Sequence, residues 1–280
     1  MPNGAPESPG RPLVDPVMSS AIKVNSPLVS LREVGKIFPN GLRALAGLNL
    51  QARAGEFLAL LGPSGCGKST VLRIIAGLSE PSEGAVEWPA AEAEGGSRRV
   101  GFVFQEPTLM PWATAFDNVL LPLRLARERG PAARERVEAA LERVGLRPFS
   151  LAYPRELSGG MRMRVSIARA LVTAPQLLLM DEPFAALDEI TRFRLNDDLM
   201  RMWQALGMTV IFVTHSVFES VYLANRVVIM APRPGRIFTE LSIDASYPRS
   251  QNFRTSAEYA ALCRRASEAL AEAMAAGDET

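Results

Sequence analysis

The sequence contains few residues of the kinds that build disulfide scaffolds or nucleic-acid-binding surfaces. Its 280 residues include 2 cysteines, which is too few for a disulfide framework. One of them, Cys66, lies in a glycine-rich loop, consistent with a reducing compartment. Lys and Arg number 31 against 30 Asp and Glu, so the net charge is +1. This balance argues against nucleic acid as the main partner.

Long apolar runs are also missing. The sequence has no run of about 18 apolar residues, so we expect no bilayer-spanning segment, and a membrane role would require separate membrane subunits. Residues 1–26 are rich in Pro, Gly and Ser and have no secretory signal, which predicts a disordered tail. The 48% of hydrophobic residues is enough for a substantial core.

A glycine-rich loop between a strand and a helix is the clearest chemical motif. Residues 62–69 read GPSGCGKS and match G-x-x-x-x-G-K-[ST]. FLALL at 57–61 predicts a buried parallel strand, and 69–78 has helical apolar spacing. We expect Lys68 to pair with the β- and γ-phosphates of a nucleotide and Ser69 to ligate Mg²⁺. The predicted nucleotide-binding residues of this loop are Gly62, Pro63, Ser64, Gly65, Cys66, Gly67, Lys68, Ser69 and Thr70.

A second apolar run, LLLM at 177–180, ends in two acids. Ligands bind at the carboxyl ends of strands in α/β sheets, which is where this run places Asp181 and Glu182. We expect Asp181 to hold Mg²⁺ through water. Glu182 is expected to accept a hydrogen bond from the attacking water, as base or water-positioning group.

Two further strand-like runs end in polar residues. VIFV at 210–213 precedes Thr214 and His215, the only histidine of the chain, and VGFVFQ at 100–105 ends in Gln105. A lone histidine is more often structural, but its position at a strand end favours contact with the γ-phosphate. Gln105 is expected to contact Mg²⁺ or the attacking water.

The stretch LSGGM at 157–161 opens a helical pattern. Ser158 and the amides of Gly159 and Gly160 form a donor-rich turn at a helix start, which attracts phosphate. A chain with two phosphate-binding helix starts, one completing the other across a dimer, is typical of an ATP-driven machine.

Together these motifs resemble the nucleotide-binding domain of ATP-binding cassette (ABC) transporters over about residues 28–240. The resemblance implies ATP hydrolysis by a head-to-tail homodimer, with each ATP between the Walker A motif of one subunit and the signature of the other. It also implies membrane permease subunits, an indirectly acting solute-binding protein and a place on the cytoplasmic face of the membrane. In family order the motifs are the aromatic loop (Phe38), Walker A (62–70), Gln loop (Gln105), signature (157–161), Walker B (177–182), D-loop (186–188) and switch histidine (His215).

Three positions depart from common family patterns. Met161 and Met163 stand where glutamines are common, and Ser216 follows the histidine where Asp is frequent. We expect phosphate contact to survive, because Ser158 is retained. The segments LSGGMR, VTHSVFES and APRPGRI look like the branch that serves nitrate, sulfonate and taurine importers, and they do not identify the solute.

The predicted fold is an α/β P-loop NTPase (RecA-like) core with an antiparallel β subdomain and a helical subdomain. We expect the ATPase domain over 27–243, the helical subdomain over about 106–160, and a C-terminal helical extension over 244–280. That extension is expected to pack on its own domain.

Several alternatives stay open at this point. Phe38 either stacks on adenine or is a core aromatic at a strand end. The segment EPTLMPW at 106–112 either docks a permease helix or packs the helical subdomain onto the core. A soluble ABC ATPase without a transport role is the main alternative function, but such proteins usually carry long coiled coils or two ATPase units. A metabolite kinase is disfavoured by the signature.

Overall fold

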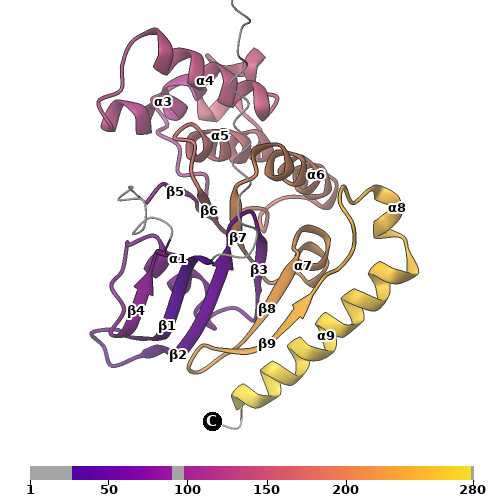
Figure 1. Cartoon of the computed structure of the whole chain (residues 1–280). Helices are drawn as coiled ribbons and strands as arrows, with labels where there is room; N and C mark the ends of the chain where they lie inside the picture. The colour runs from indigo at the N-terminus through magenta and orange to yellow at the C-terminus, as the bar shows by residue number, and fades with distance from the viewer. Residues whose placement is uncertain (1–26, 90–97, 279–280) are drawn as a thin grey trace, which may run out of the picture.

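The protein is described by a computed structural model, which describes residues 27–89 and 98–278. The predicted disordered tail 1–26 lies outside these residues, as do 90–97 and 279–280. In the view of Figure 1, a group of helices lies above the two β-sheets. The α/β architecture, with an antiparallel β subdomain and a group of helices, is the predicted one.

Within the described residues, the larger sheet has six strands in the order β5-β6-β7-β3-β8-β9. The first five are parallel and β9 is antiparallel to β8. The central strands β3, β6 and β7 are buried along their whole length, which explains their continuous apolar sequences. The strands are β5 (Val100–Val103), β6 (Leu177–Asp181), β7 (Thr209–Thr214), β3 (Phe57–Leu61), β8 (Arg226–Ala231) and β9 (Arg236–Ser242).

The smaller sheet is antiparallel, with the order β2-β1-β4. Its strands are β1 (Pro27–Ile37), β2 (Arg43–Arg53) and β4 (Glu83–Glu87), and they form the predicted antiparallel β subdomain. Apolar residues of β1 and β2 form one cluster with those of β3 and α1 (Lys68–Ile75). The antiparallel sheet therefore lies against the phosphate-loop side of the core.

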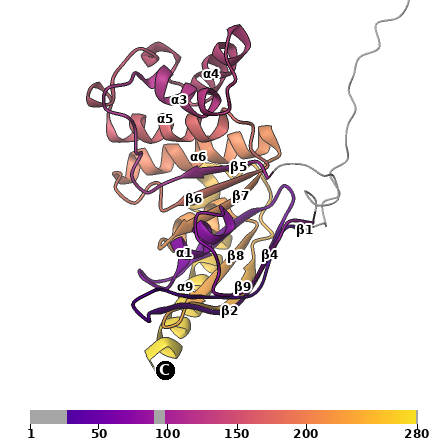
Figure 2. The same cartoon turned by 90° about the vertical axis from the view of Figure 1, so that its left-hand side faces the viewer.

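A layer of helices lies above the two sheets in both views (Figures 1 and 2). It contains α3 (Ala115–Leu125), α4 (Pro131–Arg143), α5 (Gly159–Leu171) and the short turns η1 (Arg147–Phe149) and η2 (Pro154–Glu156). Pro131 occupies the first turn of α4, where its missing N–H costs nothing. Helix α6 (Glu189–Leu206) lies between this layer and the sheet in Figure 2.

The C-terminal segment folds back along the larger sheet. After α7 (Val217–Leu223) and the last two strands, α8 (Gln251–Arg254) leads into α9 (Ala257–Asp278), which contacts β8 and α7 (Figure 1). Tyr259, Cys263 and Ala266 are buried on the inner face of α9. Burial raises the pKa of the Cys263 thiol, and both cysteines are free, as expected. The domain boundary at 243 stays a prediction.

A buried arginine ties the start of this segment to the core. Arg249 is 3% exposed. Its guanidinium donates to five backbone carbonyls, three from the C-terminal end of α7 and two from the chain after β9. Burial lowers its pKa from the usual value. A cation is favourable at a helix C-terminus, where carbonyls lack helical partners.

Two predicted boundaries differ from the structure. The strand expected over 100–105 ends at Val103. Among the described strands β5 pairs with β6 alone, and β6 itself ends one residue beyond the partner of Val103. The helix expected over 69–78 ends at Ile75, and Gly77 has a φ of 70°. Leu78 is therefore outside the helix and 61% exposed.

Candidate nucleotide-binding and hydrolysis site

Strand register brings the predicted site residues to one edge of the larger sheet. Leu61 at the end of β3 pairs with Thr214 of β7, and Asp181 at the end of β6 pairs with Val213. The phosphate loop, the acid pair and the histidine therefore leave neighbouring strands at the same level. This is the carboxyl edge, where α/β sheets place ligands.

The phosphate loop requires glycine at its junction with α1. Gly67 is the N-cap residue and has a φ of 99°, a left-handed conformation that side chains disfavour. A Cβ atom there would lie 2.6 Å from Leu45 Cδ2 and 3.1 Å from the Ala44 carbonyl oxygen. The loop is thus packed against β2, with its backbone shape fixed by glycine.

Lys68 places a cation inside this loop. Its Nζ donates hydrogen bonds to the carbonyl oxygens of Gly62, at 2.8 Å, and Pro63, at 2.9 Å. The same atom lies 3.6 Å from Oε1 of Glu182, and the lysine side chain is 3% exposed. Burial raises the pKa of Cys66 in the same loop. Lys68 is therefore the charged group at the centre of a neutral, backbone-lined loop.

Ser69 and Asp181 form a hydrogen-bonded oxygen pair. The serine Oγ donates to Oδ1 of Asp181 at 2.8 Å. Burial raises the pKa of Asp181, and the charge of Glu182 acts in the same direction, while the serine hydrogen bond opposes it. A hydroxyl and a carboxylate are hard oxygen ligands of the type that Mg²⁺ uses beside nucleotide phosphates. Within 27–89 and 98–278, no cluster of three or more His, Cys, Asp or Glu could hold a metal.

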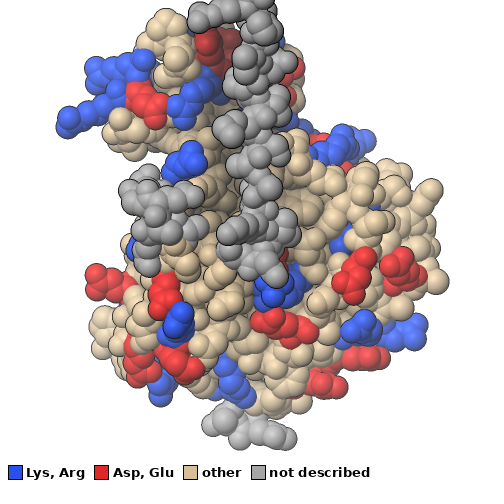
Figure 3. Space-filling view, in the orientation of Figure 1, with Lys and Arg blue, Asp and Glu red and all other residues tan. Residues whose placement is uncertain are grey.

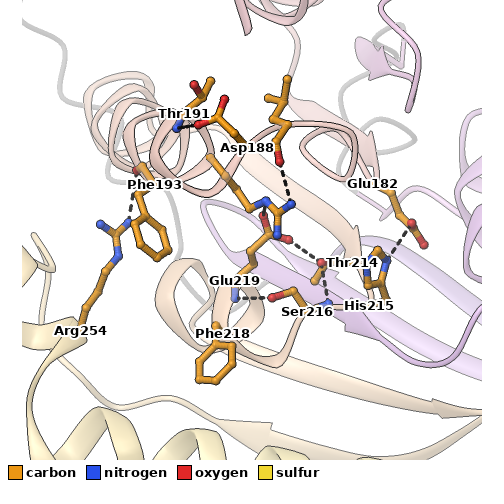
Figure 4. A network of polar contacts seen from close by, with 12 residues as sticks. Glu182, Asp188, Thr191, Phe193, Thr214, His215, Ser216, Phe218, Glu219 and Arg254 are labelled. Atoms are coloured by element: carbon orange, nitrogen blue, oxygen red, sulfur yellow. Dashed lines mark hydrogen bonds and ion pairs between the residues drawn. The ribbon is translucent and has the colours of Figure 1, made fainter. Parts of the chain in front are cut away.

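Glu182 and His215 contact each other directly (Figure 4). Nδ1 of the histidine lies 3.0 Å from Oε2 of the glutamate. Glu182 has a φ of 45°, which is uncommon for a residue with a side chain, and its N–H donates to the Val213 carbonyl at 3.0 Å. Such backbone strain gathers at functional sites. With this backbone conformation, the carboxylate of Glu182 points toward His215.

The signature turn caps its helix as predicted. Ser158 is the N-cap of α5, and its Oγ accepts a hydrogen bond from the Met161 N–H at 3.3 Å. Ser158 is exposed, whereas Met161 packs partly against the core and Met163 is buried. Both methionines thus fill apolar space. Among the described residues, no hydrogen bond or ion pair joins Ser158 to the phosphate loop of the same chain.

Gln105 and Phe38 lie at the margins of this arrangement. Gln105 is exposed, two residues beyond the end of β5, and no hydrogen bond joins it to the acid pair in the described part of the chain. Phe38 is half-buried in the turn after β1, with Lys36 Nζ 5.7 Å from its ring centroid. It belongs to neither of the buried apolar clusters formed by the described residues. Its role at adenine remains a prediction.

The segment 106–112 is held by polar contacts from two helices. Arg169 of α5 donates to the carbonyl oxygen of Thr108 at 2.8 Å and to its hydroxyl at 2.9 Å. Asn118 of α3 accepts from the Met110 N–H at 2.8 Å and donates to its carbonyl oxygen at 3.2 Å. The backbone of the segment is therefore fixed to the helical layer.

The apolar side chains of this segment divide between core and surface. Leu109 is partly buried and packs against the core, whereas Trp112 is 75% exposed. The core interpretation thus fits Leu109, and the surface interpretation fits Trp112. A large exposed aromatic side chain is typical of a contact surface.

Two residues of the site escaped sequence reasoning. Glu219, four residues after His215, is 7% exposed and accepts a hydrogen bond from the Thr214 hydroxyl at 2.6 Å. Arg192 of α6 approaches it, with Nε 3.9 Å from Oε1. An acidic residue directed inward at the start of an apolar helix was the available signal for Glu219. Nothing local marks Arg192, because its partner is 27 positions away (219 − 192).

A phosphate loop with a buried lysine, next to a serine–aspartate pair and a glutamate–histidine pair at one sheet edge, defines a P-loop ATPase. The profile of the ABC transporter family matches residues 45–185. The chain belongs to this family, and it is an ABC transporter ATPase whose ATP hydrolysis is coupled to transport.

Curated relatives match most of the chain. An uncharacterised ABC transporter ATP-binding protein of Methanocaldococcus jannaschii is 47% identical over 241 residues, covering 85% of this chain and 88% of the relative. The aliphatic sulfonates import ATP-binding protein SsuB of Bacillus licheniformis is 46% identical over 226 residues, covering 80% and 88%. The match therefore extends well beyond the motifs.

Solved structures share the fold. A dimeric ATP-binding cassette in a post-hydrolysis state, bound to ADP and Pi, has a TM-score of 0.66 at 34% identity, covering 78% of this chain and 100% of that one. CbiO1 of Clostridium perfringens, part of the ABC transporter complex cbiONQ, has a TM-score of 0.68 at 28% identity, covering 78% and 89%.

None of the helices described for 27–89 and 98–278 combines the length and apolarity needed to cross a bilayer. On the face seen in Figure 3, acidic and basic side chains are interspersed. This mixed pattern differs from the basic stripe of nucleic-acid-binding proteins.

Proposed function

We propose that the chain is the ATP-hydrolysing subunit of an importer for a small solute of the nitrate, sulfonate or taurine type, working on a separate membrane permease. The observation that carries the catalytic part is the contact of Glu182 with His215 beside Lys68. In this proposal Glu182 accepts a proton from the attacking water, and His215 holds the carboxylate and contacts the γ-phosphate. Lys68 neutralises charge on the β- and γ-phosphates.

The oxygen pair of Ser69 and Asp181 supports a Mg²⁺ site. Ser69 would ligate the ion directly, Asp181 would act through water, and Gln105 would approach from the end of β5. The bound ion would neutralise charge between the β- and γ-phosphate oxygens. Its charge would also favour ionised Asp181, which burial otherwise disfavours.

The separation of the signature from the phosphate loop supports a homodimer. Ser158 is exposed and has no polar contact with the described phosphate-loop residues of its own chain, so its phosphate-binding turn is free to complete the site of a second copy. We propose two composite sites, each with Ser158, Gly159 and Gly160 from the opposite subunit.

The segment 106–112 is proposed to dock the permease. Its backbone is fixed, and Trp112 is exposed, which suits a shallow groove for a partner helix. The permease would place this subunit at the cytoplasmic face of the membrane. A solute-binding protein would act indirectly, through the permease. The sulfonate name of the Bacillus relative supports the solute class.

Glu182→Gln tests the catalytic part. The amide keeps the size but is a far poorer proton acceptor, so ATP turnover should fall by about 10²–10⁴-fold while ATP binding is retained. The variant should also elute as a dimer with ATP on size exclusion. Glu142→Gln, at an exposed glutamate of α4, serves as the control. Turnover within twofold of the wild type would remove Glu182 from the mechanism.

Mixing two inactive variants tests the dimer. Lys68→Ala should lose ATP binding, whereas Ser158→Arg should retain it in the monomer and obstruct the partner's site. The mixed dimer keeps one intact composite site, so part of the activity should return if the sites act independently. Loss of monomer binding in Ser158→Arg, as severe as in Lys68→Ala, would contradict a site completed by the partner.

Reconstitution with the permease and binding protein tests the transport part. Aliphatic sulfonates, taurine and nitrate are added separately to proteoliposomes, and ATP turnover and uptake are measured. We expect one of these anions to stimulate both. Failure of the purified chain to associate with any membrane subunit, with normal ATP hydrolysis, would favour a soluble ABC ATPase instead.

A further inference from the structure

We infer that Glu219 is a positioning residue for the pair Glu182–His215, acting through Thr214, with Arg192 as its ionic partner. The inference rests on the proposed function, because it assumes that Glu182 and His215 carry out hydrolysis. Glu219 itself contacts neither of them by a hydrogen bond among the described residues. Its effect would pass through the backbone that carries His215.

Glu219 is bonded to the residues on both sides of His215 (Figure 4). Its Oε2 accepts from the Thr214 hydroxyl at 2.6 Å, and its N–H donates to the Ser216 Oγ at 3.3 Å. The Thr214 hydroxyl oxygen also accepts from the Ser216 N–H at 2.9 Å. These three bonds close a ring around the His215 peptide.

The histidine needs this support because packing supplies little of it. The His215 side chain is 52% exposed, whereas Thr214 and Glu219 are 2% and 7% exposed. The direction of the imidazole is therefore set by its backbone and by the contact with Glu182. A buried frame that fixes the backbone on both sides keeps Nδ1 at 3.0 Å from the carboxylate.

Apolar packing gives no reason for an acid at this place. Burial raises the pKa of Glu219, while the Thr214 hydrogen bond and the charge of Arg192 favour the ionised form. An apolar residue would avoid the cost of desolvating a carboxylate. The carboxylate is what the hydroxyl of Thr214 and the guanidinium of Arg192 both require.

Arg192 connects this frame to the signature turn. Its Nη2 donates to the Leu187 carbonyl at 2.9 Å, and its Nε lies 3.9 Å from Glu219 Oε1. Leu187 and Thr191 lie against the signature: a Cβ added to Gly160 would lie 2.8 Å from Thr191 Cγ2. A displacement of the turn that completes the partner's site would thus reach the His215 loop of the same subunit.

The test compares two threonines on one strand. Thr214→Val removes the hydroxyl without changing the size, so we expect kcat for ATP hydrolysis to fall roughly 10–100-fold, as misplaced catalytic groups cause, with KM for ATP unchanged. Thr214→Ser should restore most of the activity. Thr209→Val is the matched control, because Thr209 is buried at the other end of β7 and also makes two hydrogen bonds.

A similar loss of kcat in Thr209→Val and Thr214→Val, or none in Thr214→Val, would overturn the inference. His215→Ala, measured alongside, separates the two failures. If His215→Ala is inactive and Thr214→Val is fully active, only the positioning role is wrong. If His215→Ala is fully active, the proposed hydrolytic pair is wrong.

A second pair of variants keeps the test decisive if Thr214→Val does not fold. Glu219→Gln retains an acceptor for Thr214 but loses the charge that faces Arg192. We expect a smaller kcat loss than in Thr214→Val, and no further loss when Arg192→Met is added. Full additivity of the two losses would show that Arg192 and Glu219 act separately, which contradicts the pair.

Discussion

Lys68 and Arg249 are both cations removed from solvent, at 4% and 3% exposed, yet their surroundings differ. Arg249 is surrounded by carbonyls, to which it makes five hydrogen bonds, and it faces no carboxylate within ion-pair distance in the described residues. Lys68 has two carbonyl bonds and lies 3.6 Å from Glu182. The arginine holds the chain after β9 to the end of α7. The lysine lies among groups that would contact a nucleotide.

The burial of a cation therefore does not define its role. A buried cation that donates to carbonyls at a helix end and in the chain after β9 replaces missing main-chain partners. A buried cation in a glycine-rich loop, next to a strained glutamate, holds charge where phosphate is expected. Exposure alone would have classed the two together.

Lys68→Ala should produce the largest effect. Loss of the phosphate-facing charge should reduce ATP hydrolysis by on the order of 10²–10³-fold. The urea midpoint without nucleotide should stay close to that of the wild type. ATP binding by fluorescence titration and denaturation by circular dichroism check both halves. A large fall in stability would place Lys68 in the same structural class as Arg249.

Arg249→Met should lower stability and leave ATP hydrolysis nearly unchanged. Carbonyls at the end of α7 and after β9 lose their donors, so the free energy of unfolding should fall by about 2–4 kcal/mol. ATP turnover per folded molecule should stay within twofold. Arg249→Lys should recover part of the stability. Reduced turnover at unchanged stability would show that the C-terminal segment acts on catalysis.

Asp181→Asn should have a smaller, stabilising effect on the nucleotide-free protein. Burial raises the pKa of Asp181 in the folded state, so its deprotonation costs stability as the pH rises from its ordinary value of 3.8 through the raised pKa. Removing the charge should increase the free energy of unfolding at pH 7 by on the order of 1 kcal/mol. The gain should vanish below pH 3.8, and hydrolysis should be lost. Urea denaturation at both pH values checks this.

Trp112→Asp should change the isolated protein least. The side chain is 75% exposed, so stability should stay within about 0.5 kcal/mol and basal turnover should be unchanged. Co-purification with the permease should be lost. Leu109→Asp is the contrasting variant, because Leu109 packs against the core and its replacement should destabilise the fold. Retained co-purification of Trp112→Asp would remove this segment as the docking site.

The sequence predicted those parts of the site that follow buried strands. Continuous apolar runs located β3, β6 and β7, and the parallel sheet then aligned Lys68, Asp181 and His215. The end of β5 was missed because the length of an edge strand depends on its partner, and β6 continues just one residue past the position paired with Val103. Arg192 and Arg249 were missed for another reason: their partners are set by tertiary packing and leave no local pattern.

Helix α5 carries one functional segment at each end. Ser158 caps its beginning. Arg169, near its end, donates a hydrogen bond to the Thr108 carbonyl oxygen in the proposed docking segment. The helix has 13 residues and is about 20 Å long. If the permease docks on 106–112 as proposed, a tilt imposed there would be transmitted along α5 and would displace the phosphate-binding turn at its other end.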